Sequence, residues 1–60
     1  MRYVYYLNGA KITKKLLEDT YGKDRIKRIT DEAMEAWMED PFIQNDFFMG
    51  NGMLTVQVFP

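Results

Sequence analysis

The chain has 60 residues and contains neither cysteine nor histidine, and this absence limits how so short a chain can be stabilised. A domain of this length buries only about 60% of the surface that its unfolded chain exposes. Small domains therefore usually add a disulfide, a structural metal or a second subunit. Disulfides require cysteine, and structural zinc sites use cysteine or histidine. The sequence therefore predicts stabilisation by association between subunits.

The composition supports the same expectation. Hydrophobic residues make up 47% of the chain and aromatic residues 15%, more than one small domain can readily cover. We therefore expect a homodimer. No apolar run approaches the roughly 18 residues of a membrane span, and the N-terminus lacks the apolar core of a signal peptide. The sequence predicts a cytoplasmic protein without membrane contact.

The clearest helix pattern lies in residues 29–41. Thr30 is placed as an N-cap and is followed by two acidic residues, which the helix dipole favours. Ala33, Ala36 and Trp37 form an apolar stripe, with Trp37 as the expected core anchor and acidic residues on the opposite, solvated side. Pro41 ends the pattern. Two alternatives remain for residues 23–29. Either the helix already starts near Asp24 and includes them, or they form an extended linker and the helix starts at Asp31.

The segments on either side predict strands and a second helix. Residues 2–7 are β-branched and aromatic and predict a strand, and the Asn-Gly pair at 8–9 predicts a hairpin turn. Residues 10–12 follow as a short strand or lead directly into a helix over 14–21, capped by Thr13. Near the C-terminus, the Asn-Asp pair at 45–46 predicts a turn before a hairpin of strands 47–49 and 53–59.

These segments predict a single compact α+β domain over residues 1–60, in the order β-α-α-β-β. The N-terminal strand and the C-terminal hairpin are expected to form a small antiparallel sheet packed against the two central helices. Exposed edges of such a sheet pair readily with other chains. Either terminal strand is therefore a candidate for a dimer contact.

Catalysis is disfavoured by the residue types present. Histidine, cysteine and serine are absent, and Gly50-Asn51-Gly52 precedes a strand instead of the helix that a phosphate-binding loop requires. We expect no enzyme, no cofactor and no metal.

Charge divides the chain into two halves. Residues 1–29 hold all eight basic residues and three acidic ones, whereas residues 30–60 hold six acidic residues and no basic one. This favours attraction between subunits or between halves of the fold. The alternative is a nucleic-acid contact through the basic segment 11–28, with candidate residues Lys11, Lys14, Lys15, Arg25, Lys27 and Arg28. The acidic central helix and a pI of about 5.2 disfavour it.

A protein-interaction module is the function that the sequence favours. Surplus aromatic surface and edge strands mark partner sites. The candidate interface or dimer residues are Tyr3, Val4, Tyr5, Tyr6, Phe47, Phe48, Val56 and Phe59. The sharpest hypothesis is a phage or mobile-element inhibitor of a host defence protein, which would act in the cytoplasm of a bacterial host. A structural subunit of a larger assembly is a third hypothesis.

Overall fold

The computed structural model describes residues 1–42 and 44–60, and Ile43 lies outside the described residues. Six elements follow one another along the chain: β1 (Arg2–Leu7), β2 (Ala10–Ile12), α1 (Lys14–Tyr21), α2 (Lys23–Glu39), β3 (Asn45–Phe48) and β4 (Met53–Phe59).

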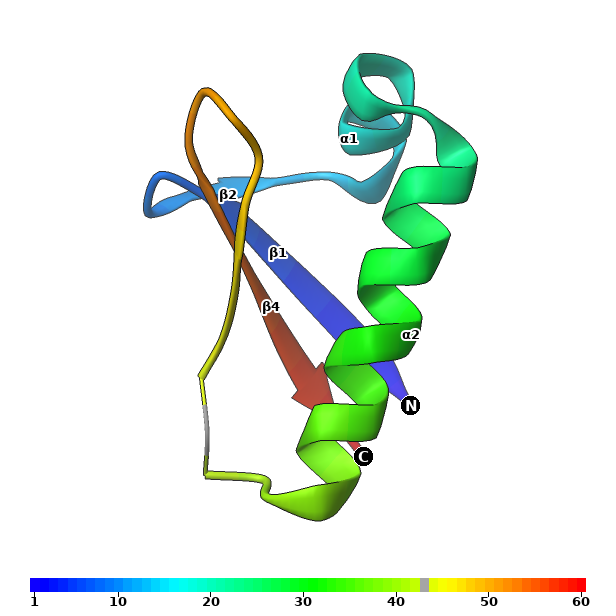
Figure 1. Cartoon of the computed structure of the whole chain (residues 1–60), viewed down its shortest axis with the longest axis vertical. Helices are drawn as coiled ribbons and strands as arrows, with labels where there is room; N and C mark the ends of the chain where they lie inside the picture. Colours follow the sequence, from blue (N-terminus) through cyan, green and yellow to red (C-terminus); the bar gives the residue numbers. More distant parts are fainter. Residues whose placement is uncertain (43) are drawn as a thin grey trace.

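The four strands form one antiparallel sheet in the order β2-β1-β4-β3, so the terminal strands β1 and β4 lie side by side at its centre. Both helices lie on the same side of this sheet, and α2 runs along its length (Figure 1). The predicted α+β class, with a small antiparallel sheet packed against two central helices, is confirmed.

The Asn-Gly turn produces the first hairpin. Asn8 and Gly9 both have positive φ angles, 52° and 84°, as expected for the tight turn that suits a two-residue hairpin. The chain returns as β2, with Leu7 opposite Ala10. The short-strand alternative for residues 10–12 is therefore correct, and the order of elements is β-β-α-α-β-β, with one strand more than the predicted order of β-α-α-β-β.

The two helices are joined through Gly22, which has a φ of 96° that suits glycine. Thr13 caps α1 as predicted, because its hydroxyl accepts a hydrogen bond from the Leu16 N–H. The second helix starts at Lys23, so the early-start alternative is correct and residues 23–29 are helical.

Thr30 is therefore not an N-cap, and this prediction was wrong. It lies buried in the middle of α2, where its hydroxyl donates to the Ile26 carbonyl at 2.8 Å. The Tyr5 hydroxyl of β1 lies 2.9 Å from the Thr30 hydroxyl oxygen. A polar pair thus joins α2 to the sheet inside an otherwise apolar layer.

The predicted turn at Asn45-Asp46 was also wrong, because both residues belong to β3. Asn45 is buried, and its side-chain amide donates to the Ala33 carbonyl of α2 at 3.4 Å. Tertiary contact with the helix therefore overrides the local turn preference of this pair.

The core lies between the sheet and the helices. Its largest fully buried side chains among the described residues are Leu17, Ile26, Leu54 and Val56, and Tyr21, Trp37 and Phe47 pack against the core while partly exposed. Among the described residues, no helix is both long and apolar enough to span a membrane.

Candidate protein-binding face of the sheet

Among the described residues, the helices cover one face of the sheet and leave the other uncovered (Figure 1), and we call the uncovered face the open face. Side chains of a strand alternate between the two faces. Tyr5, Leu54, Val56 and Val58 are buried on the helix side, so their neighbours along each strand lie on the other side. The strand register then defines the open face as Arg2, Val4, Tyr6, Lys11, Asp46, Phe48, Met53, Thr55, Gln57 and Phe59.

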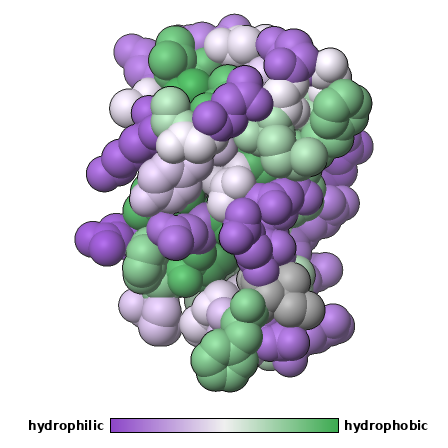
Figure 2. All heavy atoms as spheres, turned by 90° about the vertical axis from the view of Figure 1, so that its left-hand side faces the viewer, coloured by the Kyte–Doolittle hydropathy of each residue, from purple (hydrophilic) through white to green (hydrophobic). Residues whose placement is uncertain are grey.

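Half of the open face is apolar or aromatic. The exposed fraction is 72% for Phe48, 43% for Met53 and 36% for Phe59. Figure 2 views the molecule from this side and shows hydrophobic patches between polar groups. A solvated face of an antiparallel sheet normally carries polar residues at these positions. The outward apolar side chains therefore make this face the candidate binding surface of the chain.

Polar residues form one row across the middle of this face. Lys11 lies opposite Tyr6, Tyr6 opposite Thr55 and Thr55 opposite Asp46. The row thus has a cation at the β2 edge and an anion at the β3 edge. Three strand spacings of about 4.8 Å separate them by roughly 14 Å.

Asp46 is held in its charged form. Its carboxylate accepts a hydrogen bond from the Thr55 hydroxyl at 2.6 Å and two from the Gln44 amide at 3.1 and 3.2 Å. The hydrogen bond from Thr55, and then that from Gln44, lower the pKa of Asp46 below its ordinary value of 3.8. This edge of the face therefore carries a fixed negative charge at neutral pH.

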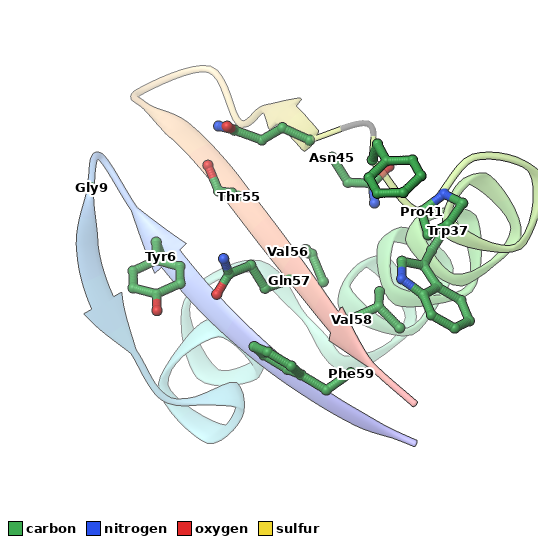
Figure 3. A pocket seen from close by; sticks show the side chains of 12 residues that line it. Tyr6, Gly9, Trp37, Pro41, Asn45, Thr55, Val56, Gln57, Val58 and Phe59 are labelled. Carbon is green, nitrogen blue, oxygen red and sulfur yellow. The ribbon is translucent and has the colours of Figure 1, made fainter.

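A groove of about 470 Å³ extends from the open face to the C-terminal end of α2. Tyr6, Thr55 and Gln57 line one part of it, and Trp37 and Phe42 line another. In Figure 3, Trp37 projects from α2 beside β4, on the opposite side of the strand from Gln57. Phe42 is 95% exposed and extends the apolar surface beyond the sheet. Trp37, expected as the core anchor, instead packs at the margin of the core.

The structure divides the eight predicted interface residues into two sets. Val4, Tyr6, Phe48 and Phe59 share the open face. Tyr5 and Val56 are buried in the core, and Tyr3 and Phe47 pack partly buried against it from the helix side. A guanidinium group covers one outward aromatic ring, because the Arg2 Cζ atom lies 5.0 Å from the centroid of Phe59.

The predicted basic residues are spread over several elements. Lys11 lies on the open face, whereas Lys14 and Lys15 are the first two residues of α1. Arg25 stacks on Tyr21, with 5.5 Å between its Cζ atom and the ring centroid. Lys27 pairs with Asp31 at 3.3 Å. Lys27 and Arg28 share a shallow depression with the carboxylates of Asp24, Asp31, Glu32 and Glu35.

Sequence reasoning missed Met53, Thr55, Gln57 and Phe42 as members of this surface. The alternation of β4 separated Met53, Thr55 and Gln57 from the apolar face, but it did not indicate which face the helices cover. Among the described residues, no group of three or more acidic side chains is arranged to hold a metal ion.

Fold and surface together define a small α+β domain with an open, partly apolar face on a four-stranded antiparallel sheet. No protein-family model, curated protein or solved structure matches the chain.

Proposed function

We propose that this chain is a non-enzymatic protein-interaction module that works as a homodimer, with the open faces of two copies packed against each other. The observation that carries the proposal is the exposure of Phe48, Met53 and Phe59 on a face that no helix covers. A stable interface buries about 800 Å² on each partner, close to one fifth of the 4295 Å² surface of this chain.

The polar row supports a second copy as the occupant. A two-fold axis that runs between β1 and β4, parallel to the strands, places Lys11 of each copy opposite Asp46 of the other. The same axis places Tyr6 opposite Thr55 of the partner copy. Two symmetric ion pairs then flank the Tyr6–Thr55 contacts, and the same axis places Val4 opposite Gln57 and Arg2 opposite Phe59 of the partner copy. Isologous interfaces of dimers require this self-complementarity.

The dimer in turn is proposed to bind another protein. The sharpest form of this proposal is a phage or mobile-element inhibitor that binds a host defence protein in the bacterial cytoplasm. The small size of the chain and the absence of histidine, cysteine and serine support a binding role over a catalytic one.

Charge reversal tests the dimer. Lys11→Glu and Asp46→Lys each replace two attractive pairs with two repulsive ones, so each is expected to raise the dimer dissociation constant about tenfold or more. The double variant recreates the pairs in reverse order and is expected to restore most of the affinity. Sedimentation equilibrium at physiological ionic strength measures all four proteins, and circular dichroism checks that each is folded.

The matched control is Lys15→Glu, which makes the same charge change on α1, away from the open face. It is expected to leave the dissociation constant within about twofold of the parent. A parent that stays monomeric at millimolar concentration contradicts the homodimer. Single variants that dimerise as tightly as the parent contradict this geometry.

Nucleic-acid binding is the second candidate. Lys11 and Lys14 lie near Tyr3 and support it. The carboxylates beside Lys27 and Arg28 reduce the positive potential that a phosphate backbone would meet, so the observations favour a protein partner. A structural subunit of a larger assembly would use the same apolar face and would form species larger than a dimer in the sedimentation experiment.

A further inference from the structure

The N-terminal half of β1 has a neighbouring strand on one side only. β1 pairs with β4 from Arg2 to Leu7, but with β2 only from Tyr5 to Leu7. The chain leaves the sheet after Ile12 and enters α1 at Lys14. In Figure 1, β2 and β1 diverge from their shared turn, and α1 begins beyond the end of β2. The sheet edge at residues 2–4 is therefore left without a neighbouring strand on the β2 side.

The backbone of Tyr3 faces this edge. Leu7 and Ala10 flank the two-residue turn, so their backbone groups face each other across β1 and β2. Asn8 instead faces β4, because its N–H donates to the Met53 carbonyl at 2.9 Å. Neighbouring residues of a strand direct their backbone groups to opposite edges. Leu7, Tyr5 and Tyr3 therefore direct N–H and C=O toward the β2 side, and β2 ends before it reaches Tyr3.

A groove of about 650 Å³ lies along this edge, and we call it the edge groove. Its lining residues are Arg2, Tyr3, Val4, Tyr5, Lys11, Ile12, Thr13 and Lys14. Three of them are basic and none is acidic. Tyr3 and Ile12 give the groove an apolar wall on the helix side of the sheet, whereas Arg2 and Lys11 lie on the open-face side. The groove is thus apolar on one side of the strand plane and cationic on the other.

We propose that the edge groove binds an extended acidic segment of a partner protein, which adds to β1 as a short strand. The backbone of one partner residue pairs with the N–H and C=O of Tyr3. The side chain of that residue lies on the helix side, against Tyr3 and Ile12. Its two neighbours point to the open-face side, toward Arg2 and Lys11. The chemistry that fits is an acidic–apolar–acidic pattern in extended conformation.

The backbone part of this proposal is tested by N-methylation. Total synthesis of the chain with an N-methyl group on Tyr3 removes the one N–H that the added strand needs. The probe is the fluorescent peptide Thr-Glu-Val-Glu-Val-Glu-Thr with blocked ends, followed by fluorescence anisotropy. N-methyl Tyr3 is expected to weaken binding at least tenfold while the circular dichroism spectrum stays unchanged.

N-methyl Phe48 is the matched control. The Met49 N–H donates to the Gly52 carbonyl, so Phe48, its neighbour, directs its N–H away from β4 at the other edge of the sheet. This chain is expected to bind the peptide like the parent. Equal affinity of the Tyr3 and Phe48 methylated chains would overturn strand addition at β1.

The charge part is tested by reversing one basic residue that lines the groove on the open-face side, Arg2, and one that does not line it, Lys15. Arg2→Glu is expected to weaken binding several-fold more than Lys15→Glu, with the difference retained at physiological salt. A peptide with lysine in place of every glutamate is expected not to bind. If it binds equally well, acidic recognition is wrong and the edge lysines act only against aggregation.

This inference is tested separately from the proposed dimer, and the two surfaces share Lys11. Peptide affinity reports on the edge groove, and sedimentation of the charge-reversed variants reports on the open face. Loss of dimer formation in Asp46→Lys with peptide binding at least as tight as that of the parent would support both proposals, because Lys11 is then released from its pair with the partner copy.

Discussion

Thr30 shows how a single hydroxyl joins helix and sheet. Its O–H donates to the Ile26 carbonyl, so the Tyr5 O–H is left to donate to the Thr30 oxygen. Both residues are buried, and a buried polar group without a partner costs more than the hydrogen bond itself contributes. The pair therefore stabilises the contact only while both members are present.

We expect Thr30→Val to lower the free energy of unfolding by about 1–3 kcal/mol, because the buried Tyr5 hydroxyl loses its acceptor. Adding Tyr5→Phe removes the orphaned hydroxyl and should recover part of the loss, which gives a non-additive double-mutant cycle. Urea denaturation measures both. Thr20→Val is the control, since Thr20 makes the same bond to Leu16 on the exposed side of α1 and should change stability by less than about 0.5 kcal/mol.

Asp46 supplies a prediction about pH. Hydrogen bonds from Thr55 and Gln44 lower its pKa in the folded state, so its stabilising contribution is complete above its ordinary pKa of 3.8, which applies to the unfolded chain. That contribution is lost as the pH falls through the lower folded pKa. Thr55→Val removes the larger cause and should raise the pKa of Asp46, as followed by NMR titration of its side-chain carbon. No rise would show that Thr55 does not hold the carboxylate.

Among the elements, α1 depends for its stability on a few contacts with the rest of the chain. It has only eight residues, and isolated helices of that length are not stable in water. Its support comes from the Thr13 cap, from Leu17 in the core and from the hydrogen bond of Tyr21 to Asn51 in the turn before β4.

Replacing the cap should therefore be measurable. We expect Thr13→Ala to lower the free energy of unfolding by about 1 kcal/mol, because the Leu16 N–H loses its acceptor. Thr13→Ser keeps the hydroxyl and is expected to retain most of the stability. If alanine and serine give the same urea midpoint, the cap is not a stabilising contact.

The whole molecule is a two-layer structure, with principal extents of 28 × 20 × 17 Å and both helices on one side of a single sheet. A two-layer domain of this kind leaves one sheet face without a covering layer. The proposed dimer covers that face, so dimerisation and folding stability are linked by mass action.

The melting temperature should therefore rise with protein concentration. We expect a progressive increase across about two orders of magnitude of concentration for the parent chain, and a much weaker one for Lys11→Glu. Differential scanning calorimetry measures both. A melting temperature that is independent of concentration in the parent would argue that the open face remains exposed to water.

Local patterns in the sequence determined the local structure. The Asn-Gly pair specified a hairpin because few residues adopt two consecutive positive φ angles, and Thr13 specified a helix start because its side chain replaces a missing backbone partner. The alternation of β4 separated its two faces correctly, and the strands and helices together predicted the α+β class.

Only the tertiary structure decided which residues are buried and which sheet face and strand edge remain exposed. Thr30 and Asn45 resembled a cap and a turn residue, but long-range hydrogen bonds to Tyr5 and Ala33 placed them inside a helix and a strand. The open face and the Tyr3 edge depend on which strands pair and where β2 ends. Backbone groups and side chains become surface or core only through contacts between distant segments, and short-range patterns contain no record of those contacts.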